Sequence, residues 1–234
     1  MAGSVEPGRK QTNDIMTNSI WPDAENTAEL LKDAKEGDGQ AVERLLARHR
    51  QSLHRMIELR MDQRIKRRVD VSDVVQDVLI EANRRLQDYL QNPAMAFHLW
   101  IRQIANDRLI DAHRRHRVSA KRSIDREQAN VVHATVDQSS LEIVAQLCDP
   151  AMTPAAAASQ RELASHVETV IARLGASDRD IILMRHYEQL NNSEIAAALG
   201  LTEPAASMRY LRAIRRLREL LDAESSDASR SAGE

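Results

Sequence analysis

The residues best suited to chemistry are the arginines that follow a short helical motif near the C-terminus. Ser193 to Thr202 has the spacing of a helix-turn-helix, with Gly200 at the turn and Thr202 as the next N-cap. One face of the following helix is small, soft and basic: Ala205, Met208, Arg209, Arg212, Arg215 and Arg216. Arginine donates to guanine edges and to phosphates, so this face predicts a helix that reads duplex DNA in the major groove.

A second basic segment lies far upstream. Residues 102–126 hold eight arginines and lysines against three acidic residues, and residues 203–218 hold five against one, although the formal net charge is only -2. Two separated basic segments indicate two contacts with a polyanion, and a solvated helix face is the alternative that charge alone leaves open.

Three carboxylates, Asp73, Asp77 and Glu81, are spaced by four residues and therefore share one helix face. Glu81 can reach Arg84 or Arg85, and the remaining charge predicts a docking face for a basic partner. An enzymatic alternative would use Asp70 and these carboxylates, or His113 and His116, as metal ligands. No further ligand cluster converges on them, so we expect no metal, no other cofactor and no catalysis.

The elements that position these residues are expected to be helices. The 234 residues are 42% hydrophobic and 29% charged, with only 7 Gly and 6 Pro, which predicts an all-α fold. The single cysteine, Cys148, excludes an internal disulfide framework, and no apolar run is long enough for a membrane span. We therefore expect a cytoplasmic protein without membrane insertion.

Periodicity predicts two helical domains joined by a linker. We expect a disordered N-terminal tail over 1–24, a first domain over 25–126, a linker over 127–160, a second domain over 161–222 and a disordered tail over 223–234. In the first domain, apolar stripes run along 74–86 and 97–105, and Phe97 and Trp100 have core spacing.

Glycines and polar residues predict where the helices of the second domain start and end. Gly175 is expected to end a helix in the left-handed conformation, and Ser177 to Asp180 resembles a capping box. Ser193 is expected to be another cap. The final helix is expected to turn one side to the core: Ala206, Tyr210, Ala213, Ile214, Leu217 and Leu221.

Three motifs in order resemble the extracytoplasmic-function (ECF) sigma factors. Asp70 to Val78 resembles the second conserved region of that family. The set Phe97, Trp100, Ile101, Ile104, Ala105, Ile110, Asp111, Arg114 and Arg115 resembles the adjoining promoter-melting segment. Ser193 to Leu217 resembles the fourth region. The matches cover Ala28 to Arg117 and Arg161 to Leu221, which is most of the chain.

The resemblance implies a two-domain factor, region 2 and a region 4 helix-turn-helix, that directs core RNA polymerase to promoter DNA. Its polymerase-binding residues would be Asp73, Gln76, Asp77 and Glu81. Its minus-ten contacts would be Tyr89, Arg102, Asn106, His113, Arg114, Arg115 and Arg117. Here Tyr89 is placed beside the loop at Asn92, and Arg102, Asn106 and His113 are expected to face outward.

The minus-thirty-five contacts would come from the basic face of the last helix, at Ala205, Met208, Arg209, Arg212, Arg215 and Arg216. An anti-sigma factor is left open as a further partner. A helix-turn-helix activator of the response-regulator type is the alternative function, although no alternating strand and helix pattern precedes Arg161.

Overall fold

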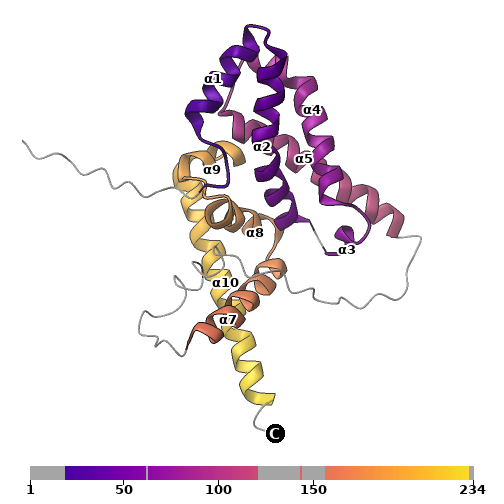
Figure 1. Ribbon diagram of the computed structural model, residues 1–234. Coiled ribbons are helices and arrows are strands. Elements are labelled where there is room, and N and C mark those ends of the chain that lie inside the picture. Colours follow the sequence, from indigo (N-terminus) through magenta and orange to yellow (C-terminus); the bar gives the residue numbers. More distant parts are fainter. Residues whose placement is uncertain (1–18, 62, 121–142, 144–155, 232–234) are drawn as a thin grey trace, which may run out of the picture.

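The computed structural model describes residues 19–61, 63–120, 143 and 156–231 (Figure 1). Every regular element in these ranges is helical, so the predicted all-α class is confirmed. The helices form an N-terminal lobe before residue 121 and a C-terminal lobe after residue 155.

The N-terminal lobe is built from α1 (Ala24–Lys35), α2 (Gly39–Arg60), the short α3 (Gln63–Lys66), α4 (Val71–Gln91) and α5 (Phe97–Ala120). Three of these helices begin at an aspartate whose carboxylate accepts a backbone N–H of the first turn: Asp23, Asp38 and Asp70. Such caps satisfy donors that a helix cannot pair internally, and this explains where the helices start.

The core of this lobe follows the predicted stripes. Along α4, the buried side chains are Val74, Val75, Val78, Leu79, Ala82 and Leu86. On α5, Phe97, Ile101, Ile104 and Ala105 are buried and Trp100 is partly buried. The core packing predicted for these residues is therefore confirmed.

The N-terminal tail ends earlier than the sequence suggested. Trp21 is buried, and the hydroxyl of Ser52 donates to the carbonyl of Ile20. The indole of Trp21 lies 6.5 Å from the ring of His49 and 6.0 Å from that of His98. Because this aromatic ring fills a gap between helices, placing it in a tail that extends to residue 24 was wrong.

The C-terminal lobe consists of α7 (Ala156–Arg173), α8 (Ala176–Ile182), the π-turn η1 (Leu183–Tyr187), α9 (Asn192–Leu199) and α10 (Glu203–Ser231). The core side predicted for the last helix is confirmed, since Ala206, Ala213 and Leu217 are fully buried. The helix continues past residue 222, so the disordered tail predicted from 223 was placed too early.

Three of the predicted helix ends are wrong. Gly175 has φ of −56°, not a left-handed value. Helix α8 begins directly after it without a side-chain cap, so Ser177 does not open a capping box. The cap of α9 is Asn191 rather than Ser193, and it forms a capping box with Glu194. Gly200 has φ of +63°, as the turn of the helix-turn-helix requires.

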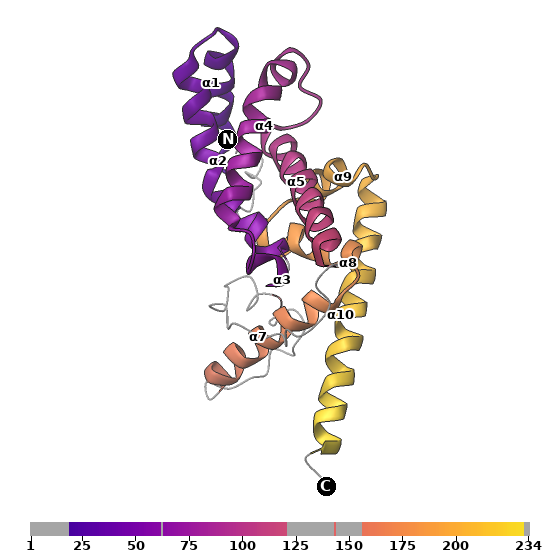
Figure 2. The ribbon, with the colours of Figure 1, turned by 90° about the vertical axis from the view of Figure 1, so that its right-hand side faces the viewer.

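The two lobes pack against each other. Helix α9 contacts α5, and the buried apolar side chains of both lobes form one continuous cluster. Figure 2 shows α9 beside α5, with α10 running along the far side of the C-terminal lobe and away from the N-terminal one. The N-terminal lobe therefore does not cover the outer side of α10, where Met208 and Leu211 are exposed.

Candidate functional site

The outer face of α10 is open to solvent where sequence reasoning placed the DNA-reading residues. Met208, Arg212, Arg215 and Arg216 are exposed, while Ala205 and Arg209 are partly buried. Thr202 accepts the N–H of Ala205 at 3.4 Å and caps the helix as expected. The structure thus brings all six predicted residues to one end of one helix.

Three of the residues predicted to bind polymerase lie on the exposed face of α4. Asp73, Gln76 and Asp77 are exposed, and Ile80 beside them is 60% exposed. Ile80 therefore places an apolar side chain in solvent beside these polar residues.

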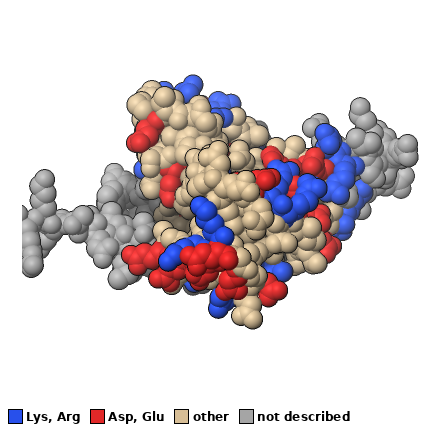
Figure 3. Space-filling model, turned by 90° about the horizontal axis from the view of Figure 1, so that it is seen from above, with Lys and Arg blue, Asp and Glu red and all other residues tan. Residues whose placement is uncertain are grey.

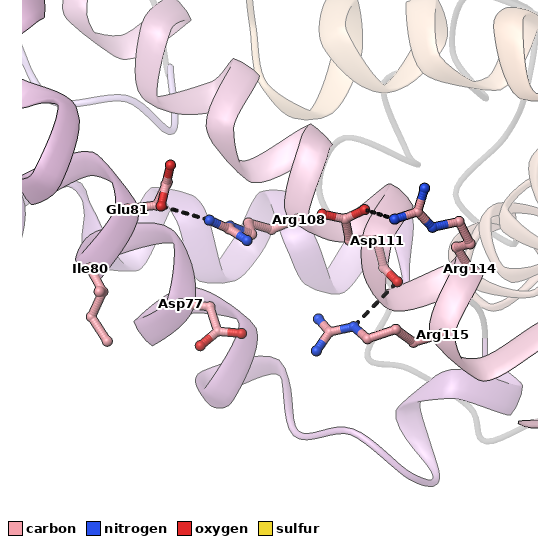
Figure 4. Close-up of a pocket in the computed structure, with 7 residues that line it drawn as sticks. All are labelled: Asp77, Ile80, Glu81, Arg108, Asp111, Arg114 and Arg115. Carbon is pink, nitrogen blue, oxygen red and sulfur yellow. Dashed lines mark hydrogen bonds and ion pairs between the residues drawn. The ribbon is translucent and has the colours of Figure 1, made fainter.

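Glu81 does not belong to that open face. It is only 5% exposed and accepts from Arg84 at 2.7 Å and from Arg85, as predicted, and it also pairs with Arg108 of α5 at 2.7 Å (Figure 4). The hydrogen bond from Arg84 lowers the pKa of Glu81, and burial opposes that effect. Because three guanidiniums already surround this carboxylate, the expectation that it faces a partner is corrected: it ties α4 to α5.

The outer half of α5 carries the basic residues of the upstream segment. Arg114 and Arg115 are exposed, and both contact Asp111, through its carboxylate at 3.3 Å and its carbonyl at 3.4 Å. These three residues line a hollow of about 290 Å³ with Asp77, Ile80, Glu81 and Arg108 (Figure 4). Asn106 and His113 are partly buried, and the side chain of Arg117 lies outside the described residues.

Arg102 is not on that outer face. It is 3% exposed, and its guanidinium donates to both carboxylate oxygens of Glu188, at 2.9 and 3.3 Å, and to Asp180 at 3.2 Å. A helical wheel shows only how residues are arranged around one helix, so it could not show that the C-terminal lobe covers this side of α5. The expected outward position was wrong.

Tyr89 is also inside. It is 7% exposed, its hydroxyl donates to the carbonyl of Met95 at 2.9 Å, and its ring lies 4.7 Å from Trp100 and 5.5 Å from Phe97. Burial raises the pKa of this phenol. Tyr89 therefore closes the loop that starts at Asn92 over the aromatic core, and it does not present a platform to a base.

The residues that sequence reasoning missed are the partners of Arg102. Glu188 is fully buried, and Asp180 and Arg60 complete a four-residue cluster across the two lobes. Asp180 and Glu188 lie in a segment that also holds Asp178, Arg179 and Arg185, so nothing in its local pattern singles them out or reveals a partner in another lobe.

Charged side chains form groups on the face of the molecule seen from above in Figure 3. Figure 3 shows one mainly acidic group and a second group in which basic and acidic side chains mix.

Within the described part of the chain, no three His, Cys, Asp or Glu residues are grouped to hold a metal, and no helix is long and apolar enough to cross a membrane.

Comparison with known proteins places both lobes. The family profile of sigma-70 region 2 matches residues 45–118, and that of sigma-70 region 4 matches residues 170–219. The RNA polymerase sigma factor CnrH of Cupriavidus metallidurans is 27% identical over 156 residues, which is 67% of this chain and 75% of that protein. The RNA polymerase sigma-E factor of Streptomyces coelicolor is 39% identical over 59 residues, 25% of this chain and 33% of that protein.

Solved structures share the arrangement of helices. The structure of CnrH in complex with the cytosolic domain of CnrY aligns with a TM-score of 0.52 at 24% identity, over 86% of this chain and 99% of that one. The sigma factor RpoE in complex with the anti-sigma factor NepR, from Bartonella quintana, aligns with a TM-score of 0.51 at 17% identity, over 77% and 96%. At these identities the two structures show the fold alone.

The two family profiles fall in the order and on the lobes that the three sequence motifs indicated, and a helix-turn-helix activator of the response-regulator type does not account for the region 2 match. The protein belongs to the sigma-70 family as an ECF-type RNA polymerase sigma factor, a non-enzymatic protein that directs transcription initiation.

Proposed function

We propose that α10 reads the minus-thirty-five promoter element. The observation that carries this proposal is the division of one helix into a fully buried side at Ala206, Ala213 and Leu217 and an exposed basic side at Arg212, Arg215 and Arg216. A helix so divided can enter the major groove without disturbing its own lobe, and it offers bidentate donors to guanine and charge to phosphate. Ala205, Met208 and Arg209 complete the contact at its N-terminal end.

The exposed face of α4 is proposed to bind core RNA polymerase. Asp73, Gln76 and Asp77 are aligned on it, and the adjacent Ile80 supplies apolar area. A partner with basic side chains around an apolar pocket would neutralise the two carboxylates and remove Ile80 from water. Glu81 supports this face from behind by fixing α4 to α5 through Arg108.

The minus-ten element is proposed to lie along the outer half of α5. Arg114 and Arg115 are exposed there, Asn106 and His113 precede them on the same helix, and Arg117 follows. Guanidiniums suit the phosphates of a strand that must be held open, and the amide of Asn106 is the side chain in this set that pairs most naturally with a base edge.

Two further assignments follow from the family. CnrH is seen in complex with the cytosolic domain of CnrY, and RpoE in complex with the anti-sigma factor NepR. We propose an anti-sigma protein as a partner of this chain. Because core polymerase and promoter DNA are its other partners, we place the protein in the cytoplasm.

Binding of duplex DNA by the full chain tests the α10 assignment. Arg212→Ala should weaken binding to a minus-thirty-five duplex and lower the slope of log K against log salt by about 1, because one phosphate or base contact is lost. Arg44→Ala is the matched control, since Arg44 is an exposed arginine on α2 whose guanidinium pairs with Asp38 at 3.2 Å. An equal effect of both substitutions would contradict the assignment.

A further inference from the structure

One side chain of α9 is hydrogen-bonded to two places on α10. Asn192, the first residue of α9, donates from its amide nitrogen to the carbonyl of Glu203 at 3.1 Å. Its amide oxygen accepts from the hydroxyl of Ser207 at 3.2 Å. A carbonyl can only accept, so the amide has to turn its nitrogen to Glu203 and its oxygen to Ser207. Both hydrogen-bonding ends of Asn192 are therefore used on α10.

These two contacts restrain the orientation of α10. Glu203 and Ser207 are four residues apart, so they lie on the same face of the helix, about 6 Å apart along its axis. A single contact would allow α10 to turn about that point, whereas two contacts one turn apart resist both rotation about the axis and sliding along it. Helix α9 lies against the beginning of α10 (Figures 1 and 2), so the restraint acts on the first turns of α10.

The apolar packing of these two helices provides less directional restraint. The buried side chains in this part of α9 and α10 include two alanines, Ala196 and Ala206. An alanine has no branches that interlock with a neighbouring helix, and apolar burial is non-directional. A hydrogen bond, in contrast, weakens steeply when its donor and acceptor are misaligned. The bonds of Asn192 therefore define the direction of α10 more sharply than these alanines do.

The direction of α10 decides whether its arginines reach base edges. The ends of side chains lie about 5–6 Å from a helix axis, so a rotation of about 10° moves them by about 1 Å. A group that binds specifically has to be held within about 0.5 Å of its working position. Arg209 and Arg212 follow Ser207 by two and five residues on the same helix. An error of orientation at Ser207 is therefore passed on to them.

We propose that Asn192, Glu203 and Ser207 form a polar clip that positions α10 for selecting the minus-thirty-five element. This inference rests on the proposed function of α10, and it makes Asn192 a positioning residue that does not itself contact DNA. Since the hydroxyl of Ser207 is engaged by Asn192, the clip contributes geometry and no charge to the complex. Sequence selectivity then depends on the clip, whereas general attraction to DNA comes from the arginines.

The C-terminal lobe should keep its fold without the clip. The hydroxyl of Tyr210, three residues after Ser207, is hydrogen-bonded to Nε2 of His186 in η1 at 2.9 Å, so α10 has a second anchor. Helix α9 keeps the capping box that begins at Asn191. Alanine is a better helix former than serine or asparagine. Asn192→Ala and Ser207→Ala should therefore alter the orientation of α10 without unfolding the lobe, which circular dichroism verifies.

The first test separates sequence selection from general DNA binding by the full chain. The probes are two duplexes of equal length, one with the upstream element that wild-type holoenzyme selects from randomised templates and one with that element scrambled. Asn192→Ala and Ser207→Ala should each lower the ratio of the two affinities by about fivefold or more, because misplaced arginines lose base contacts. Affinity for the scrambled duplex and the slope of log K against log salt should stay the same, since phosphate contacts are kept.

The matched control is Ser193→Ala, because the hydroxyl of Ser193 donates to Asn191 at 2.7 Å at the start of α9 itself. It should leave the affinity ratio unchanged, and Ser207→Thr, which keeps a hydroxyl, should retain most of it. The double alanine variant at Asn192 and Ser207 should lose no more than Asn192→Ala alone, since both substitutions break one network. An unchanged ratio in Asn192→Ala would overturn the proposal. A lower salt slope would also overturn it, because Asn192 would then be a direct phosphate contact.

A second measurement judges the clip without DNA. In a Cys148→Ser background, spin labels at Ala197→Cys on α9 and Leu211→Cys on α10, both exposed positions, report the distance between the two helices. Wild type should give one narrow distance distribution, and Asn192→Ala should widen or shift it by about 1 Å or more, as the rotation requires. Identical distributions would overturn the clip. A wild type that binds both duplexes equally would instead refute the proposed function of α10, and the distance distribution would then decide whether the clip orients the helix.

Discussion

Acidification should destabilise the N-terminal lobe through one buried histidine. His49 lies on α2 with no exposed surface, and its Nδ1 is 2.8 Å from the carbonyl of Leu45. Its ring centroid lies 4.9 Å from that of Phe97 in an edge-to-face arrangement. Burial lowers the pKa of His49 from 6.5 to about 4, against the raising effect of the hydrogen bond. The unfolded chain therefore takes up a proton more readily than the folded one between these two values, so the free energy of unfolding falls as the pH falls through 6.5 toward 4.

The size of the effect follows from the two pKa values. Between pH 7.5 and 5.0 the difference corresponds to a loss of about 2 kcal/mol for His49. His186 in the C-terminal lobe has its pKa lowered to about 4, chiefly by burial, and adds a similar loss if the lobes unfold as one unit. The lowered pKa values of the Asp180 and Glu188 carboxyls affect stability only below this pH range, where carboxyls of the unfolded chain begin to take up protons.

Tryptophan fluorescence during urea unfolding reads this effect directly, because both tryptophans, Trp21 and Trp100, belong to the N-terminal lobe. Replacing the imidazole in His49→Leu should reduce the pH-dependent loss by about 2 kcal/mol. Met56→Leu, a buried substitution on the same helix without a titratable group, should keep the full loss. If His49→Leu loses as much stability as wild type between pH 7.5 and 5.0, the reasoning is refuted.

Three other outcomes are expected. Asp77→Arg should abolish retention of the factor on immobilised core polymerase while the circular dichroism spectrum stays unchanged; full retention would remove α4 as the docking face. Leu217→Ala, which empties a fully buried site between α10 and its lobe, should lower the free energy of unfolding by about 2–5 kcal/mol in urea titrations, and a loss under 1 kcal/mol would contradict that packing. Tyr89→Phe removes the bond to Met95 and should cost about 1 kcal/mol without changing minus-ten DNA affinity; weaker DNA binding would return Tyr89 to the promoter contacts.

The spacing of apolar residues within a segment predicted which side of each helix is buried. The apolar stripe of α4 and the buried side of α10 are visible in the sequence because a helix that packs on one face repeats its apolar residues every three to four positions. The turn at Gly200 could also be predicted locally, because the left-handed backbone conformation there favours glycine.

What failed depends on contacts between distant segments. Arg102 has the spacing of a solvent-facing residue on α5, and only the packing of the C-terminal lobe turns it into a buried partner of Glu188. The burial of Tyr89 also depends on a contact outside its own helix, because the loop after Asn92 folds back so that Met95 accepts the hydrogen bond of the phenol. Trp21 lies in a segment too short for periodicity, so its place between helices could not be read from spacing.

We infer that this chain binds core polymerase through its first lobe and selects a start site through its second. Supplying purified core enzyme with the factor and a pool of DNA templates randomised upstream of the start site, then sequencing the transcripts, tests both parts together. We expect transcripts from templates enriched in one spaced pair of elements, and a changed upstream element when Arg212 is replaced. Transcripts no more abundant or selective than those of core enzyme alone would contradict the account.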